Sequence, residues 1–322
     1  MVGHRASLVN ALYQGCKRQP AIRFGFSTKA QGLASFSPKP SFTAITRSGT
    51  PYQVTADILL AADGVKSTIR QSLLAALGIQ DNVQDTGQAA YRIMLTREQM
   101  QHDSELLSLI NTERSIYNLS TTQPDVNFAA AASTTYTTKG SKTSMLQVFG
   151  DFCPLIRRML DLVPDGEVCE WKLRGHQPLP TWIQGSVALL GDACHPTLPH
   201  LAQGAVQAIE DGAVLGVCLS RIKDTSPETI YGALKCYEET RKQRAETLVE
   251  MAASSGRELH LGEGAAKDER DLQFAKLKAA RGKGRVPDKW ADQDVQKLIY
   301  GTDCIAMAEK ALALQNHVVA VV

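Results

Sequence analysis

The sequence lacks the patterns that mark several common classes of protein. Its seven cysteines are an odd number and form no C-x-x-C pair, which argues against a disulfide framework and against a zinc site. No apolar run is long enough to span a bilayer, and the amino terminus has no apolar h-region, so we expect no transmembrane segment and a cytoplasmic location. The formal net charge of +2 gives no indication of a nucleic acid partner.

A further absence concerns dinucleotide binding. The Gly-x-Gly-x-x-Gly turn, which supports a dinucleotide diphosphate at a helix amino terminus, occurs nowhere in the 322 residues. The chain opens instead on a helical pattern at 4–16, with Leu8, Leu12 and Cys16 four residues apart. Because an α/β domain rarely begins on a helix without a strand before it, this pattern suggests that an upstream segment is missing.

The most informative stretch is 187–218, which combines an apolar segment, a glycine–acid turn and a helical pattern. The run 187–190 predicts a strand buried on both faces, and such strands present ligands at their carboxyl ends, where Gly191 and Asp192 follow. A helix predicted to begin after Gly204 would direct free N–H groups at whatever lies in front of it. A carboxylate beside a helix amino terminus suits a ligand with a polyol and an anionic group, and a flavin has both.

A second unit of the same design stands earlier in the chain. Residues 58–62 predict a buried strand, Asp63 and Gly64 follow it, and a helix comes next that Ser67 or Thr68 could cap. Before this unit we expect short strands and loops over 22–42, and a hairpin formed by 42–46 and 52–55.

The remaining segments predict a smaller sheet and a helical tail. Strands are expected at 91–95, 115–119, 126–132 and 170–173, and a helical piece at 142–162. Helices are expected at 227–258, 268–280 and 292–314, with a solvated linker at 281–290.

With both turns in view, the chain resembles the class A flavoprotein monooxygenases, the aromatic hydroxylases of the salicylate hydroxylase type. DGVKSTIR (63–70) and LLGDACHP (189–196) resemble the D-G and G-D motifs of that family, and HRASL (4–8) resembles its H-R-x-x-L segment. LPTW (179–182) and DKWADQDVQKLIYGTD (288–303) are also similar to sequences of this type. These motifs stand in family order and span nearly the whole chain.

The resemblance implies an α/β fold: a Rossmann-like FAD-binding domain of the aromatic hydroxylase type that lacks its first βαβ unit, with an inserted small β-sheet substrate domain and a C-terminal helical tail. Residues 1–85 would form the first part of the FAD-binding domain and 86–175 the inserted substrate-binding sheet. Residues 176–225 would form the return segment of the FAD-binding domain, and 226–322 the C-terminal helical region.

The resemblance also implies roles for single residues. Arg5 would lie against FAD, Asp192 after Gly191 would bind the ribityl hydroxyls, and Asp63 with Gly64 would contact the cofactor and help to receive NAD(P)H.

The flavin ring would be lined by a loop that includes Pro199, Gln203, Gly204 and Ala205, and this loop is the implied catalytic segment. Tyr91 and Arg92 could be strand surface or could line the substrate pocket.

The implied function is that of a monooxygenase. NAD(P)H reduces FAD, O₂ forms a flavin C4a-hydroperoxide, and one oxygen atom passes to an aromatic or other electron-rich small molecule. The alternative is a truncated, catalytically inactive relative or an incomplete gene model that keeps only part of the FAD site. The absent glycine-rich turn favours this alternative, as do a short passage between Arg92 and Tyr117 and Val206 at a position where the family commonly has a small or amide residue.

Simpler interpretations exist for several of these residues. Asp192 and Asp63 could be turn or capping carboxylates, and Arg5 could be a solvated helix residue. His195 and His200 flank a proline loop beside Cys194, but no carboxylate or second cysteine completes a set of ligands, so we expect no metal.

The helical run 205–217 contains apolar residues that we expect in the core whatever the function. They are Val206, Ile209, Ala213 and Val217.

Overall fold

The computed structural model describes residues 5–110, 116–124, 137–282, 284, 286, 287, 289, 290 and 292–321. In this part of the chain the strands form three sheets, ordered β1-β2-β3, β4-β10-β9 and β6-β5-β8-β7. The strands are β1 (Lys29–Ser35), β2 (Ser41–Ile45), β3 (Pro51–Thr55), β4 (Leu59–Ala61), β5 (Val83–Thr96), β6 (Ile116–Pro124), β7 (Thr137–Lys139), β8 (Cys169–His176), β9 (Ile183–Gln184) and β10 (Val187–Leu189).

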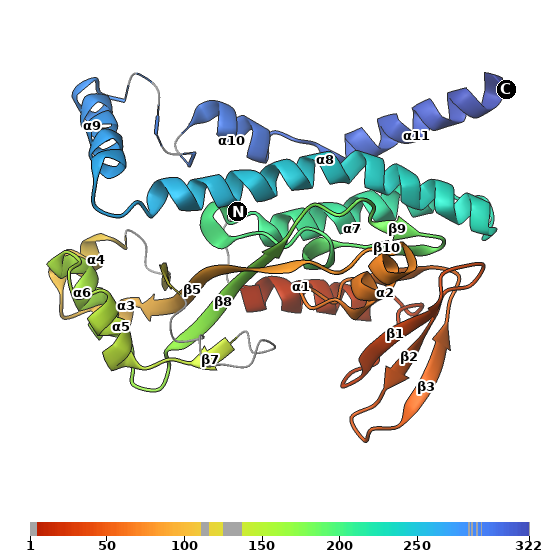
Figure 1. Ribbon diagram of the computed structural model, residues 1–322, viewed down its shortest axis with the longest axis horizontal. Coiled ribbons are helices and arrows are strands. Elements are labelled where there is room, and N and C mark those ends of the chain that lie inside the picture. The colour runs from red at the N-terminus through yellow and green to blue at the C-terminus, as the bar shows by residue number, and fades with distance from the viewer. Residues whose placement is uncertain are drawn as a thin grey trace.

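The helices lie around and above these sheets (Figure 1). They are α1 (Arg5–Lys17), α2 (Thr68–Ala76), α3 (Arg97–Met100), α4 (Ser104–Ser108), α5 (Lys142–Val148), α6 (Pro154–Asp161), α7 (Gly204–Ser220), α8 (Pro227–Leu259), α9 (Ala265–Ala279), α10 (Gln293–Tyr300) and α11 (Cys304–Val321).

The central sheet is built on β10, whose residues are all buried. β10 pairs in parallel with β4 and antiparallel with β9. A hydrophobic cluster joins β10 to α2, α7 and α8 through side chains such as Leu73, Val214 and Leu234.

β10 is covered on both faces, and such strands read as continuous apolar runs, which is why 187–190 was recognisable from the sequence. The strand predicted at 58–62 is present as β4. However, β4 lies at the edge of this sheet and its Leu60 is 41% exposed, so the prediction that it is buried was wrong in part.

The sheet of β1, β2 and β3 lies at one end of the molecule (Figure 1). β2 and β3 form an antiparallel hairpin in which Phe42 lies opposite Val54, and Gly49 takes a positive φ of 83° in the turn. This confirms the hairpin predicted at 42–46 and 52–55. The short strands and loops predicted over 22–42 are also confirmed, since the described residues 22–28 and 36–40 form no strand and β1 lies between them.

The sheet of β5 to β8 lies at the other end and carries helices α3 to α6 on one face (Figure 1). From Tyr91 to Thr96, β5 alternates between buried and exposed residues, as a strand with one covered face does. The helix predicted at 142–162 is two helices, since Pro154 begins α6 after a turn that ends α5. The strand predicted at 126–132 lies outside the described residues.

The carboxyl-terminal half of the described chain is mainly helical. α8 is 33 residues long and confirms the helix predicted at 227–258. The single helix predicted at 292–314 is divided into α10 and α11 around Gly301. Among the described residues, no helix combines the length and the apolar character needed to cross a bilayer.

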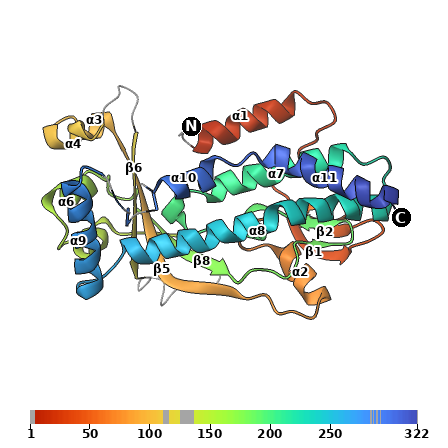
Figure 2. The same ribbon diagram turned by 90° about the horizontal axis from the view of Figure 1, so that it is seen from above.

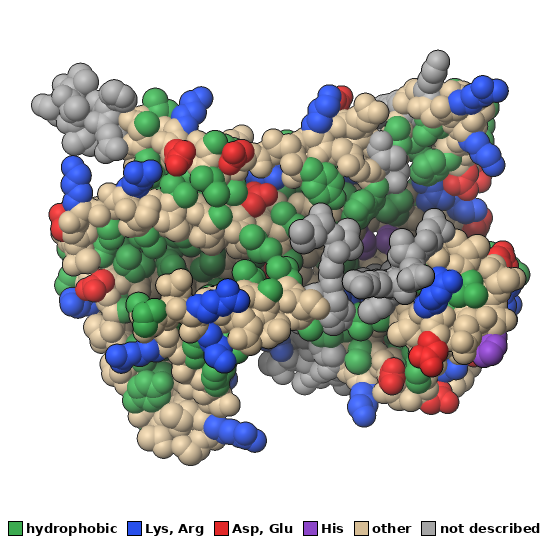
Figure 3. Space-filling view, turned by 180° about the vertical axis from the view of Figure 1, so that it is seen from behind, with side chains coloured by type: hydrophobic (Ala, Val, Ile, Leu, Met, Phe, Trp, Pro, Cys, Tyr) green, Lys and Arg blue, Asp and Glu red, His purple; other side chains and the backbone are tan. Residues whose placement is uncertain are grey.

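The helix α1 lies at the periphery of the molecule (Figure 2). Its apolar residues Leu8, Val9 and Leu12 are 44%, 55% and 54% exposed. Hydrophobic side chains are also visible across the face seen from behind, which is hollowed between its two lower lobes (Figure 3). The pattern at 4–16 therefore predicted the helix correctly, but its apolar side faces solvent.

The turn between β9 and β10 gives a test of the central sheet. Gly185 has a φ of 56°, and a Cβ added there would lie 2.6 Å from the carbonyl oxygen of Phe36. We expect Gly185→Ala to lower the free energy of unfolding by about 3 kcal/mol, because it combines a left-handed conformation with a clash against backbone. Urea unfolding measures the change.

The matched control is Gly216→Ala in α7, where an added Cβ would meet nothing within 4 Å in the described part of the chain. This substitution should raise stability by about 1 kcal/mol, as alanine does in helix interiors. Equal unfolding midpoints for Gly185→Ala and the wild type would contradict the proposed clash.

Candidate functional site

The two acid–glycine turns meet at one edge of the central sheet. β4 and β10 run in parallel with Leu59 opposite Val187 and Ala61 opposite Leu189, and the amide of Leu190 continues the ladder to Ala61 O at 3.0 Å. Since the carboxyl ends of parallel strands lie at the same edge, Asp63 and Asp192 both follow strands that end there. The structure therefore brings together two segments that stand far apart in the sequence.

Both turns depend on glycine. Gly64 has a φ of 80° and Gly191 a φ of 59°, conformations that residues with a Cβ rarely adopt. At Gly191 an added Cβ would also lie 3.1 Å from the Cβ of Ala208 on α7. The second turn can therefore lie directly against the helix that follows it.

Asp63 supports the helix after the first turn. Its Oδ2 accepts hydrogen bonds from the amides of Thr68 at 2.9 Å and Ile69 at 3.4 Å. Ser67 caps the same helix by accepting from the amide of Arg70 at 2.9 Å. The capping role considered for Asp63 is thus present, and the residue also lies at the sheet edge beside the second turn.

Arg70 links the two turns, a role that sequence reasoning did not assign. Its side chain is fully buried and donates to Asp81 through Nε and Nη2, at 3.1 and 3.0 Å. The same guanidinium donates to Val65 O in the first turn at 2.9 Å and to Ala193 O in the second turn at 3.2 Å. This geometry fixes the separation of the two turns.

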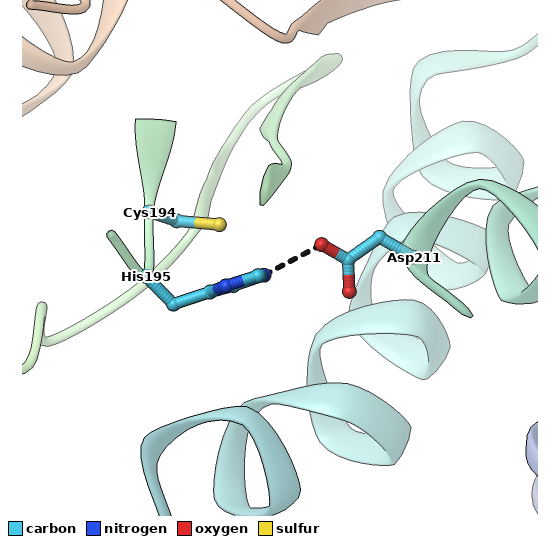
Figure 4. A group of neighbouring side chains, drawn as sticks. All are labelled: Cys194, His195 and Asp211. Carbon is cyan, nitrogen blue, oxygen red and sulfur yellow. Dashed lines mark hydrogen bonds and ion pairs between the residues drawn. The ribbon is translucent and has the colours of Figure 1, made fainter. Parts of the chain in front are cut away.

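Asp211 on α7 holds the second turn from the other side. Its Oδ2 accepts from the amide of Gly191 at 2.8 Å and lies 2.6 Å from His195 Nε2 (Figure 4). Its Oδ1 accepts from Arg241 Nε on α8 at 2.9 Å. Asp211, His195 and Arg241 are almost completely buried, so their charges depend on one another rather than on water.

The electrostatics of Asp211 and Asp192 differ. Burial opposes the ionisation of Asp211, but hydrogen bonding and charge from His195 and Arg241 outweigh it and lower the pKa of this carboxyl. Asp192 is solvent-exposed, yet the surrounding protein still reduces its hydration and raises its pKa, against a smaller opposite effect of His195. The pKa of Asp192 in the turn is therefore raised, whereas the pKa of Asp211 on α7 is lowered.

The network extends along α7 and α8. Glu210 is paired with Arg241, and with Arg244 at 3.0 and 3.1 Å. Arg241 Nη2 also donates to Gln207 Oε1 at 2.7 Å. Sequence reasoning missed these residues; the available signal was the acid pair Glu210 and Asp211 within the otherwise mainly apolar run 205–218.

Cys194, His195 and Asp211 also place three ligand atoms within 4.8 Å of one another. The sequence argument against a metal was wrong in saying that no carboxylate accompanies these side chains. However, both Asp211 oxygens already accept from N–H donors, one of them the cationic Arg241, which disfavours a second cation. Burial raises the pKa of the Cys194 thiol, which also opposes its use as a thiolate ligand or nucleophile.

The residues of the loop before α7 differ in their exposure to solvent. Pro199 begins a short 3₁₀ turn, η3 (Pro199–Leu201), and is exposed. Gln203 is 1% exposed, its side chain directed to Leu201 O and Gln207, so only its backbone could face a ligand. Gly204 and Ala205 form the first turn of α7, where Gln203 makes no side-chain capping hydrogen bond to described residues.

The buried face of α7 differs from the expected one. Val206 and Ile209 are 38% and 48% exposed, and Ala213 and Val217 are only partly buried, so placing these four in the core was wrong in part. The fully buried residues of α7 lie on a neighbouring face of the helix. They are Gln207, Asp211, Val214, Leu215 and Cys218. The salt-bridge network makes burial of the polar residues possible.

The two residues considered for the substrate pocket lie on opposite faces of β5. Tyr91 is 0% exposed and packs edge-on against Phe149 in the core below α5 and α6, which places it away from any ligand surface. Arg92 is exposed and lines a groove of about 520 Å³. The groove is also lined by Met94 and Trp171 of the sheet and by Ala6 and Val9 of α1. The side chain of Arg5 lies outside the described residues.

The buried charge network is testable by substitution of Asp211. We expect Asp211→Asn to lower the free energy of unfolding by about 3 kcal/mol at neutral pH, because it leaves Arg241 without one of its buried countercharges. The pKa of Asp211 is lowered in the folded protein, so its contribution is present above the ordinary aspartate value and is lost as the pH falls below that value. The stability gap between wild type and variant should close only at acidic pH.

The control is Asp165→Asn, since Asp165 is exposed in the turn before β8. Unfolding in urea at a series of pH values measures both variants. The assigned role would be contradicted if, at neutral pH, Asp211→Asn lowered the free energy of unfolding by no more than Asp165→Asn does.

Comparison with known proteins identifies the family to which the chain is similar. The sequence profile of a family described as "FAD binding domain" matches residues 5–252. The FAD-dependent monooxygenase OpS4 of Beauveria bassiana is 33% identical over 298 residues, which are 84% of this chain and 65% of that protein. The 3-hydroxybenzoate 6-hydroxylase 2 of Aquipseudomonas alcaligenes is 27% identical over 80% of this chain and 78% of its own length.

Among solved structures, a salicylate hydroxylase substrate complex superimposes with a TM-score of 0.74 at 24% identity, covering 96% of this chain and 75% of the other. The chain thus spans just under two thirds of the length of the Beauveria bassiana relative and three quarters of the similar structure. The match of the profile over most of the chain, together with the shared fold, shows that this chain belongs to the FAD-binding domain family of the class A aromatic hydroxylases.

Proposed function

We propose that the chain binds FAD as part of a monooxygenase that uses NAD(P)H and O₂ to hydroxylate an aromatic or other electron-rich small molecule. The observation that carries this proposal is the meeting of the Asp63–Gly64 and Gly191–Asp192 turns at the carboxyl edge of parallel strands. Ligands of open α/β sheets bind at such an edge.

The residues at this edge suit the parts of a flavin. Asp192, exposed and at the end of β10, would accept hydrogen bonds from the ribityl hydroxyls. The first turn of α7, at Gly204 and Ala205, would direct its N–H groups and its partial positive charge toward the electron-rich edge of the ring. Asp63, Gly64 and Arg5 would contact the remainder of the cofactor, as the resemblance implies.

Bound FAD would supply the chemistry, the NAD(P)H-dependent activation of O₂ for transfer of one oxygen atom to the substrate. The tasks left to this chain are binding, orientation and exclusion of water. Pro199 and the backbone of Gln203 would lie along the ring, and the groove beside β5 would hold the substrate.

The groove on the open face of β5 has aromatic and apolar lining and two opposite charges, Arg92 and Glu167, of which Arg92 would pair with an anionic substrate. Met94 and Trp171 provide apolar surface, and Arg92 provides a guanidinium, which matches the geometry of a carboxylate. The similar hydroxylase from Aquipseudomonas alcaligenes is named for 3-hydroxybenzoate, a compound of this class. We therefore propose an aromatic carboxylate as the substrate class.

Flavin binding is tested directly by the visible absorption spectrum of the purified protein. We expect flavin bands that persist through gel filtration, or that return after incubation with FAD. Asp192→Ala should raise the dissociation constant for FAD about tenfold or more, because a carboxylate–hydroxyl hydrogen bond contributes about 1.5–3 kcal/mol.

Asp165→Asn serves again as the control, because it removes an exposed carboxylate far from the sheet edge in sequence. Colourless protein that FAD cannot reconstitute would contradict the proposal and favour the catalytically inactive alternative. Unchanged FAD affinity in Asp192→Ala would reduce Asp192 to a turn residue.

The role of Arg92 is tested with the FAD-loaded protein and 3-hydroxybenzoate. We expect Arg92→Met to raise the concentration of this compound that half-saturates NAD(P)H oxidation about tenfold, because the charged hydrogen bond is lost while apolar bulk remains. Arg157→Met, on the exposed side of α6, should leave it unchanged. An equal response of both variants would remove Arg92 from the substrate site.

A further inference from the structure

The motif at 288–303 has a place in the structure that the proposed function does not explain. Of this motif, Lys289, Trp290 and residues 292–303 are described, and they form a short segment followed by α10. Lys289 fastens the segment to α8, with Nζ 3.1 Å from Ser254 Oγ and 2.5 Å from Glu258 Oε1. α10 then lies alongside α8 (Figures 1 and 2).

From there the segment reaches the loop in front of α7. Trp290 Nε1 donates a hydrogen bond of 2.8 Å to the backbone oxygen of His200. The next residue, Leu201, is 1% exposed and packs in a cluster with Ile299 and the partly buried Val295 of α10 and with Leu248 and Ala252 of α8. Trp290 therefore holds the backbone of His200, and α10 together with α8 packs against the side chain of Leu201.

The loop adopts a conformation that needs such support. Ala202 has a φ of 51°, which is unfavourable for a residue with a Cβ and persists only where the surroundings impose it. The residues on either side, Leu201 and Gln203, are both buried. The ring of His200 lies so close to Gly256 of α8 that a Cβ at that position would be 2.4 Å from it.

A second connection leads from α10 to the Gly191–Asp192 turn. Arg244 donates to the carbonyl oxygens of Leu298 and Ile299 at the end of α10, at 2.8 and 3.0 Å. Arg244 also pairs with Glu210, which shares Arg241 with Asp211, the residue that holds the amide of Gly191. The end of α10 is thus joined to both segments that the proposed function assigns to the flavin.

We propose that Lys289, Trp290 and α10 form a positioning element that holds the loop from Pro199 to Gln203 in its strained conformation, so that the backbone before α7 is set for the flavin ring. This inference rests on the proposed function for its ligand, but its structural part concerns the protein alone. Trp290 is the positioning residue with the most direct contact, because its indole N–H reaches the loop backbone.

The test is Trp290→Phe in the full chain, which keeps an aromatic ring and removes the donor. Hydrogen exchange followed by mass spectrometry on peptides covering 198–206, without added FAD, should be about three- to tenfold faster than in the wild type, as expected from the loss of one hydrogen bond. The dissociation constant for FAD should rise by a similar factor. Tyr300→Phe is the control, since Tyr300 is 59% exposed on α10.

A second variant separates positioning from general loosening. Ala202→Gly removes the Cβ that makes the left-handed conformation unfavourable, so Trp290→Phe combined with Ala202→Gly should regain most of the FAD affinity lost in Trp290→Phe. Loss of FAD affinity without faster exchange at 198–206 would overturn the proposal, as would equal exchange in Trp290→Phe and the wild type. Faster exchange in a chain that binds no FAD would support the positioning element and contradict the proposed function instead.

Discussion

The carboxylate of Asp211 is removed from water and held by an amide and an imidazole from the turn after β10 and by a guanidinium from α8. Its negative charge is stable there only because each partner is in place, and each partner is in turn oriented by it. One partner is the amide of Gly191, the first residue of the turn that ends β10. The path of the chain after β10 therefore depends on a side chain on α7, as well as on hydrogen bonds of the sheet.

Arg70 complements this arrangement from the opposite direction. It is a buried cation whose carboxylate partner, Asp81, lies outside both turns, while its other donors reach one carbonyl oxygen in each turn. The site is thus held between one buried anion and one buried cation, each with its own counterion. Such an arrangement fixes geometry without placing an uncompensated charge near the ligand position.

Much of the fold could be predicted because its signals are local. The apolar runs that became β4 and β10, the hairpin of β2 and β3, and the period of α8 were all legible in the sequence. The burial of α7 was not, because apolar residues usually mark the inner face, and here the inner face carries Gln207 and Asp211. Their burial depends on Arg241, which is distant in the sequence, so local pattern could not reveal it. Tyr91 was uncertain for a related reason, since alternation identifies two faces of a strand without saying which one is covered.

The length of α8 has a consequence for the whole fold. Its 33 residues correspond to about 50 Å of continuous helix, and along that length it contacts the central sheet through Tyr237, the charge network through Arg241 and the loop through Leu248. These contacts share one rigid axis, so their relative orientation is set by residue count. A single residue inserted between Arg241 and Leu248 would rotate one part of the helix by about 100° against the other. The number of residues between these contacts in α8 is therefore as important for the fold as the identity of the side chains that make them.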